Sequence, residues 1–276
     1  MSEHEQVKIG RISYINVAPV YYGLDRNMNP SWLTMVTEPP AVLNGMLERG
    51  DIVLSPVSSA AYAKNHKDWM IMPDLSISSF GSVMSVILVS RYPLEELHGR
   101  RVFFTEESAT AAALTRYIFS ITNIDPVIET GKITDSSSLS HTADAALVIG
   151  DTALIQNWPA HFTYVYDLGE MWKTMTGLPF VFAVWAVRRD FARNHPQALE
   201  DIKALFRDSK LLGESHKDEI VENASLKTGL SKDLCRSYFE NLICDLGPLH
   251  HKGLETFFKG LFRVGIISSD VTIEYA

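Results

Sequence analysis

The chain has 276 residues, and its 25 lysines and arginines against 33 aspartates and glutamates give a formal charge of −8. This acidic balance, without a basic tract, argues against nucleic acids and anionic membranes as partners. No stretch approaches the roughly 18 uninterrupted apolar residues of a membrane helix. The first residues lack the basic segment and apolar run of a secretory signal, so we expect a cytoplasmic protein. Two cysteines, Cys235 and Cys244, are too few for a disulfide framework or a four-ligand zinc site.

Short β-rich runs alternate with helical patterns over the first ninety residues. Strands are predicted at residues 7–13, 33–37, 51–56 and 83–90, and helices at 16–24, 39–49 and 58–65. The run at 83–90 is almost entirely apolar, which is typical of a strand covered on both faces.

The alternation restarts after residue 93 and gives way to helices after residue 190. Further strands are predicted at residues 101–105, 145–149, 164–168 and 180–188, with helices at 108–122 and 170–176 and a short one after 150–151. The serine-rich segment 134–142 is predicted to be a loop. The tail is predicted to form helices at 196–212, 217–228, 231–242 and 250–264.

This order of elements predicts an α/β protein with largely parallel sheets. The tail supplies helices but no sheet, so it must pack on an earlier one. The most economical arrangement has two lobes, with residues 1–90 and 186–276 in lobe I and residues 91–185 in lobe II. The run 83–90 then leaves lobe I and 180–188 returns, and the two crossings form a hinge beside a small-molecule cleft. The alternative is one continuous doubly wound sheet.

The sequence lacks the motifs of several common chemistries. No Gly-x-Gly-x-x-Gly follows a strand and no Walker-type Gly-Lys-Ser/Thr is present, so a nucleotide site is not indicated. There is also no Gly-x-Ser-x-Gly and no His-Glu-x-x-His. The adjacent pair His250 and His251 points in different directions on a helix and makes a poor metal site.

Small hydroxyl residues and glycines recur where predicted strands end and helices begin. These junctions are residues 13–16, 56–60, 79–85, 105–110 and 150–153. In parallel α/β sheets ligands bind at such ends, where backbone N–H groups at helix starts can hold an anion without a formal positive charge. Each residue also has a structural explanation, because Asn16, Ser58 and Ser108 are ordinary helix caps. Trp172 and Trp185 likewise suit either the core or an apolar wall for a ring-shaped ligand.

Five motifs in order, within about residues 8–190, carry a family resemblance. They are residues 10–19, 50–52 with 56–59, 81–86, 150–154, and 166–172 with 176–185. They resemble the motifs of chorismate dehydratases, the first enzymes of the futalosine route to menaquinone. The resemblance implies a two-lobed fold like that of type 2 periplasmic solute-binding proteins, working as a cytoplasmic enzyme. It also implies a hydro-lyase (carbon–oxygen lyase) that converts chorismate to 3-[(1-carboxyvinyl)oxy]benzoate without a metal, nucleotide or redox cofactor.

The resemblance also implies which residues form the site. Asn16 and Ser85 match positions expected to contact substrate, with Asn16 nearest the reacting ring edge. Asp151 is the one motif carboxylate considered as acceptor of the C3 proton, and a carboxylate of the substrate is the alternative. The remaining substrate-binding residues are expected to be Ser13, Tyr14, Ser58, Ser59, Ser82, Thr105, Ser108, Ala109, Gly150 and Trp172.

Two other functions fit the same fold. One is a small-anion binding protein or sensor, against which the missing secretory signal and missing lipid-attachment cysteine count. The other is the related enzyme that acts later in the pathway on cyclic dehypoxanthinylfutalosine. The segments 13–19 and 172–179 favour the chorismate branch.

Overall fold

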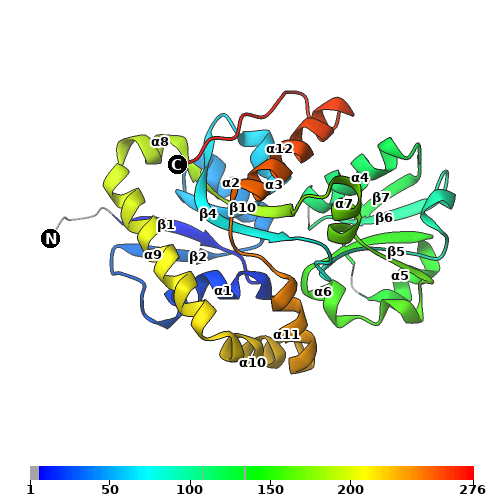
Figure 1. Ribbon diagram of the computed structural model, residues 1–276, viewed down its shortest axis with the longest axis horizontal. Coiled ribbons are helices and arrows are strands. Elements are labelled where there is room, and N and C mark those ends of the chain that lie inside the picture. The colour runs from blue at the N-terminus through cyan, green and yellow to red at the C-terminus, as the bar shows by residue number, and fades with distance from the viewer. Residues whose placement is uncertain (1–5, 108, 134) are drawn as a thin grey trace.

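The computed structural model describes residues 6–107, 109–133 and 135–276, and it contains two five-stranded sheets that lie side by side (Figure 1). The first sheet has the order β2-β1-β3-β10-β4, formed by β2 (Leu33–Thr37), β1 (Val7–Arg11), β3 (Leu54–Ser58), β10 (Phe180–Arg188) and β4 (Trp69–Ser79). The second has the order β7-β6-β8-β5-β9, formed by β7 (Val127–Gly131), β6 (Arg101–Thr105), β8 (Ala145–Ile149), β5 (Val86–Ser90) and β9 (Tyr164–Asp167). We call the first sheet with its helices lobe I and the second lobe II. The predicted two-lobed α/β fold is confirmed.

Both sheets are mixed, but each has one strand that runs against the other four, so the prediction of largely parallel sheets holds with one exception in each sheet. Within lobe I, β1 runs parallel to β2 and β3, but β10 runs antiparallel to β3 and β4. Within lobe II, β6 runs parallel to β7 and β8, but β5 runs antiparallel to β8 and β9. The antiparallel members are the strands by which the chain enters each lobe. The chain does not reach these strands through a strand–helix–strand connection within the same sheet. Such a connection is what makes neighbouring strands parallel.

The chain passes between the sheets twice, at residues 80–85 and 168–179. Val86–Ser90 lies in the second sheet, whereas the predicted division placed it in lobe I. Phe180–Arg188 lies wholly in the first sheet, although the predicted boundary at 185/186 cuts through it. An apolar run in the sequence identifies a buried strand. The sheet that the strand joins depends on pairing with strands distant in the sequence, and a local pattern carries no information about that pairing.

Twelve α-helices are described, and they surround the two sheets. They are α1 (Ala18–Tyr21), α2 (Pro40–Arg49), α3 (Ser59–Asn65), α4 (Ala109–Ile121), α5 (Ser136–Thr142), α6 (Gly150–Ile155), α7 (Leu168–Thr176), α8 (Arg189–Asn194), α9 (Pro196–Ser215), α10 (Lys217–Thr228), α11 (Lys232–Asn241) and α12 (Pro248–Arg263). Helix α5 replaces the predicted loop, because the Asp135 side chain caps it by accepting from the Ser138 N–H and Leu139 is buried. The sequence patterns also missed β4 and β7.

The second crossing shows how local sequence sets the path between the lobes. Asp167 ends β9 and caps α7 by accepting hydrogen bonds from the N–H groups of Gly169 and Glu170. Gly177 ends the helix at φ 68°, in the left-handed region that favours glycine. Between them Trp172 is fully buried. The helix is thus fixed at both ends and along one face, and it delivers the chain to β10.

The helical tail packs on lobe I, as predicted, and it also reaches lobe II. Helix α9 covers α1, where the ring of Phe206 meets Tyr21 edge-on at 5.3 Å. Helix α12 packs against β10 and α3 but also against α4 of lobe II. The hairpin of α10 and α11 lies beside α6 in Figure 1, and Leu154 of α6 belongs to the same apolar cluster as Tyr238 of α11. Among the residues with described positions, no helix is both long and apolar enough to traverse a bilayer.

Candidate active site

A cleft lies between the lobes, at the edge where β1, β3 and β8 end. From lobe I it is lined by Ile12, Tyr14, Asn16, Pro40, Pro56, Val57, Ser58, Ile77, Phe182 and Ala183, and from the first crossing and lobe II by Val83, Ser85, Val86, Glu107, Ile149 and Gly150. Most of these side chains are apolar, and Glu107 is the one charged side chain among the described residues of this lining. Such a cleft suits a compact ligand with an apolar body and a few polar groups.

The structure brings five of the predicted site residues together here: Tyr14, Asn16, Ser58, Ser85 and Gly150. They come from four segments of the fold. Tyr14 and Asn16 follow β1, and Ser58 ends β3, so parallel pairing places them at one sheet edge. Ser85 lies on the first crossing, and Gly150 begins α6 directly after β8. Both lobes therefore supply polar groups to the cleft.

Asn16 is distinguished by an unpaired atom. Its Oδ1 is buried and has no hydrogen-bond partner among the described residues. A buried acceptor left without a donor costs about 1–3 kcal/mol, so such atoms usually serve a ligand or a water. Because Asn16 lines the cleft, we infer that a hydrogen-bond donor of the ligand meets this oxygen.

Ser85 is almost fully buried and is tied to its surroundings on two sides. Its carbonyl accepts from the Gly150 N–H at 2.7 Å, which joins the first crossing to the start of α6. Its Oγ accepts from the Tyr238 hydroxyl at 3.3 Å. The preceding residue, Met84, has φ 63°, a backbone conformation that non-glycine residues rarely adopt. The crossing is therefore bent sharply where it presents Ser85 to the cleft.

Tyr14 and Glu107 close the cleft from opposite lobes. The Tyr14 hydroxyl donates to Glu107 Oε2 at 3.0 Å. Burial, together with the nearby Glu107 carboxylate, raises the pKa of Tyr14, so the phenol stays protonated and remains a donor. The Tyr14 ring also lies over Gly150, whose φ of 64° suits glycine. A Cβ at that position would lie 3.4 Å from the ring.

Asp151 makes the second link between the lobes. Its Oδ1 accepts from the Ile15 N–H at 3.4 Å, and the carboxylate is not among the described groups that line the cleft. Burial raises the pKa of Asp151, and the hydrogen bond from Ile15 and the charge of Lys227 partly offset that effect. Lys227 itself donates to the carbonyl of Ser13. Asp151 thus holds the loop that carries Asn16 in place. The sequence did not suggest this role.

Replacing Asp151 by Asn is expected to leave kcat within about threefold of the wild type, because the amide keeps an oxygen for the Ile15 N–H. The raised pKa means that the folded protein holds this proton more tightly than the unfolded chain does. Stability from the protonated form is therefore lost as the pH rises through the raised pKa. Denaturant titrations should show equal stabilities in acid and an advantage for the variant at neutral pH, below about 1 kcal/mol since the group is partly exposed.

Two results would contradict this account of Asp151. A variant less stable than the wild type at neutral pH would mean that the carboxylate charge stabilises the fold. A loss of more than about a hundredfold in kcat would restore Asp151 as the proton acceptor.

Besides Asp151, six predicted residues with described positions lie outside the cleft lining. Ser59 Oγ donates to the Val181 carbonyl at 2.6 Å, Ser82 Oγ donates to Asp167 at 2.7 Å, and Thr105 Oγ1 accepts from the Glu107 N–H at 3.3 Å. Trp172 Nε1 donates to the Pro179 carbonyl at 3.2 Å, and its ring is core. Ala109 is exposed at the start of α4. Ser13 is exposed in a neighbouring hollow with Lys227, and Ser108 lies outside the described residues.

Several backbone N–H groups expected to bind an anion are already bonded within the protein. The Ala60 N–H donates to Thr110 Oγ1 at 2.9 Å, and the Ala61 N–H donates to Ser58 Oγ at 3.3 Å. The Gly150 N–H is held by the Ser85 carbonyl. The start of α3 and the start of α6 thus have fewer free donors than the sequence suggested. Side-chain groups of Asn16, Ser58, Ser85 and Tyr14 are left as the main polar contacts.

The cleft residues that were absent from the predicted site include one charged side chain, Glu107, and one phenylalanine ring, Phe182. Glu107 lies within a predicted junction but was not singled out. Phe182 on β10 is largely buried, and it lines the cleft beside Ala183, its neighbour in the chain. Strand alternation should send these two side chains to opposite faces. The pairing of β10 with β4 shifts register between Val181 and Ala183, and this irregularity breaks the alternation.

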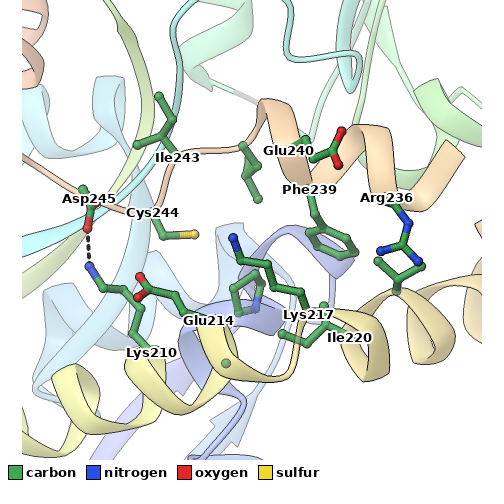
Figure 2. Close-up of a pocket in the computed structure, with 14 residues that line it drawn as sticks. Lys210, Glu214, Lys217, Ile220, Arg236, Phe239, Glu240, Ile243, Cys244 and Asp245 are labelled. Carbon is green, nitrogen blue, oxygen red and sulfur yellow. Dashed lines mark hydrogen bonds and ion pairs between the residues drawn. The ribbon is translucent and has the colours of Figure 1, made fainter. Parts of the chain in front are cut away.

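A roomier hollow lies away from the cleft, between α9, α10, α11 and the segment after α11 (Figure 2). It carries both signs of charge, and Lys210 pairs with Asp245 at 2.5 Å across one end. None of the predicted site residues lines it. Within the described ranges, no three His, Cys, Asp or Glu side chains gather as metal ligands would. The cleft therefore remains the candidate active site.

The two sheets, the double crossing and the cleft between them define a periplasmic-binding-protein-like fold. The periplasmic aliphatic sulphonate binding protein of Escherichia coli matches it with a TM-score of 0.66 at 15% identity, over 96% of this chain and 89% of that one. A family model described as "Menaquinone biosynthesis" matches residues 7–263. The chain belongs to this menaquinone biosynthesis family, and the predicted family is confirmed.

Two relatives with named activities are similar to most of this chain. The chorismate dehydratase of Thermus thermophilus is 31% identical over 268 residues, which is 92% of this chain and 94% of that protein. The 1,4-dihydroxy-6-naphtoate synthase of Streptomyces coelicolor is 25% identical over 223 residues, which is 75% of this chain and 74% of that protein.

Proposed function

We propose that this protein is a chorismate dehydratase. It is a cytoplasmic lyase that eliminates water from chorismate to give 3-[(1-carboxyvinyl)oxy]benzoate in the futalosine route to menaquinone. The structural observation that carries the proposal is the unpaired Oδ1 of Asn16, buried in a mostly apolar interlobe cleft. The 31% identity to the Thermus thermophilus enzyme supports the same choice of substrate.

The chemistry of the substrate states what the cleft must do. Chorismate carries two carboxylates, a ring diene, a hydrogen at C3 and a hydroxyl at C4. Loss of the C3 proton gives a carbanion delocalised toward the ring carboxylate, and departure of the C4 hydroxyl then makes the ring aromatic. A catalyst has to fix the ring, stabilise the developing charge and prevent competing rearrangements.

Asn16 is assigned to the reacting edge of the ring. Its Oδ1 accepts a hydrogen bond from the C4 hydroxyl, which fixes the bond that breaks and satisfies the buried acceptor. The hydroxyls of Ser58 and Ser85 donate to substrate oxygens. Phe182, with apolar neighbours such as Ile77, encloses the ring and keeps water away, which strengthens each of these polar contacts.

The proton acceptor is assigned to the substrate itself. Glu107 already accepts a hydrogen bond from Tyr14, and Asp151 accepts from Ile15 outside the cleft lining. The enolpyruvyl carboxylate, attached through oxygen at C3, is within reach of both the C3 hydrogen and the C4 hydroxyl. It takes the proton from C3 and returns it to the departing hydroxide, so that water leaves and the carboxylate is regenerated.

Replacing Glu107 by Gln is expected to lower the KM for chorismate by about three- to tenfold at low salt. Glu107 is the charged side chain of the described lining, and its negative charge opposes a dianionic substrate. The amide oxygen still accepts from Tyr14, so kcat should change by less than about twofold. Steady-state kinetics at rising ionic strength should show the advantage shrinking as the charges are screened. An unchanged or higher KM at low salt would contradict the proposed binding mode.

The proposed reaction is tested by incubating the purified protein with chorismate and following the absorbance and mass of the aromatic product. We expect catalytic turnover to the vinyl ether of 3-hydroxybenzoate. Binding without release of this product would indicate a receptor. Turnover of cyclic dehypoxanthinylfutalosine in place of chorismate would indicate the later enzyme of the pathway. Either of these results would overturn the proposal.

A further inference from the structure

Helix α11 of the tail brings a buried phenol to the cleft. Tyr238 is 2% exposed, and it packs in the apolar cluster that includes Ile15 of lobe I and Leu154 of lobe II. Its hydroxyl lies 3.3 Å from Ser85 Oγ, which itself lines the cleft. Buried tyrosines in general find a partner for the hydroxyl, and here that partner is a residue of the candidate active site.

The direction of this hydrogen bond follows from burial. Desolvation raises the pKa of Tyr238, so the phenol remains neutral and donates to Ser85 Oγ. A serine hydroxyl has one hydrogen and two lone pairs. With one lone pair occupied by Tyr238, the rotation of the Ser85 hydroxyl is restricted, and its hydrogen remains available for a ligand in the cleft.

The same helix also supports the residue before Ser85. Asn241 Nδ2 donates to the sulfur of Met84 at 3.5 Å, and Met84 holds the left-handed conformation that turns the crossing. Asp167, at the end of β9, accepts from the Val83 and Met84 N–H groups of the same crossing. The first crossing is therefore held by hydrogen bonds to the end of β9 and to helix α11. Ser85 is the last residue of this crossing, and its partner Tyr238 on α11 lies 153 positions later in the chain.

We propose that Tyr238 is a positioning residue for the dehydration, which orients the Ser85 hydroxyl toward the substrate. The inference rests on the proposed function and extends it to the tail, which the sequence predicted only to pack on lobe I. A phenylalanine would fill the same apolar cluster, so packing alone does not account for the hydroxyl. Its interaction with Ser85 does.

The test is the substitution Tyr238→Phe, which deletes one oxygen from the interior. With chorismate as substrate, kcat should fall roughly tenfold and KM should stay within about twofold, since a misdirected Ser85 weakens transition-state contacts more than ground-state binding. The matched control is Tyr62→Phe. The Tyr62 side chain is also buried, and its hydroxyl accepts from the Glu274 N–H, away from the cleft. Loss of this hydroxyl should leave kcat and KM unchanged.

A double-mutant cycle separates positioning from a general structural effect. In a Ser85→Ala background, Tyr238→Phe should change kcat by less than about twofold, because the group that it orients is gone. A tenfold loss that persists in that background would overturn the inference, and so would wild-type kcat in the single variant. Both results leave the proposed function intact, whereas a wild-type protein that fails to convert chorismate would refute the function itself.

Discussion

Replacing Asn16 by Ala is expected to reduce kcat for chorismate by about a thousandfold, the size of effect seen when a transition-state hydrogen bond is removed from an enclosed site. The same change should not destabilise the free protein. Asn16 Oδ1 is buried without a partner, so its removal relieves a desolvation cost. We therefore expect the unfolding midpoint in denaturant to stay the same or rise while turnover is lost.

The Asn16→Ala prediction combines a large loss of turnover with unchanged or higher stability, and general damage to the fold would not give that combination. Asn44→Ala is the matched control, because Asn44 on α2 also has a buried, unpaired Oδ1 but does not line the cleft. Its kcat should equal that of the wild type. Turnover by Asn16→Ala within about tenfold of the wild type would remove Asn16 from the reaction. A large drop in its stability would show that the side chain serves the fold instead.

Replacing Asp167 by Ala is expected to lower the free energy of unfolding by about 3–4 kcal/mol. The carboxylate accepts from two N–H groups at the start of α7, and from the Ser82 hydroxyl and the Val83 and Met84 N–H groups of the first crossing. Alanine removes the helix cap and leaves donors of the other segment unpaired. Ser85 directly follows Met84 in the chain, so loss of the Asp167 contacts should also displace Ser85. We therefore expect kcat to fall by about tenfold or more.

Two controls calibrate the Asp167 prediction in urea titrations. Asp135→Ala removes the cap of α5, where the carboxylate accepts from the Ser138 N–H, and should cost about 1 kcal/mol. Asp167→Asn keeps one acceptor oxygen and should fall between the wild type and Asp167→Ala. A loss below about 1 kcal/mol for Asp167→Ala would mean that water replaces its contacts and that the two crossings are not mutually dependent.

The contrast between Asn16 and Asp167 suggests how this fold supports a reaction. The loop that carries Asn16 is held by Asp151 and Lys227, so both lobes and the tail fix its position. Ser85 is fixed by Gly150 and Tyr238 in the same way. These contacts join segments from the beginning, middle and end of the chain. They fix the polar groups of the cleft before a ligand arrives, which is the condition for electrostatic stabilisation of a transition state.

The sequence predicted the edge of the sheet where the polar groups gather, because that edge follows from local patterns. Strand–helix alternation placed Asn16 and Ser58 at the ends of β1 and β3, and Gly150 at the end of β8. The pattern does not say whether a hydroxyl at such a junction faces the cleft or bonds inside the fold. Ser58 faces the cleft, while its neighbour Ser59 donates to the carbonyl of Val181, 122 residues later.

The remaining differences have the same origin in distant contacts. Ser82 is drawn to Asp167, and Trp172 packs against Phe257 of the tail with ring centroids 5.9 Å apart. Phe182 reaches the cleft through an irregularity in strand pairing. Tyr238 lies in a tail with few diagnostic motifs, and its link to Ser85 joins residues 153 positions apart. None of these contacts leaves a local signal in composition or periodicity.

The most direct test of the account is a crystal structure of the protein with 3-[(1-carboxyvinyl)oxy]benzoate bound. We expect the aromatic ring in the interlobe cleft beside Phe182, with Asn16 and Ser85 in hydrogen-bond contact with its oxygens and with no lysine or arginine on either carboxylate. Density for the product in the hollow of Figure 2, or a carboxylate held by a basic side chain, would contradict the account.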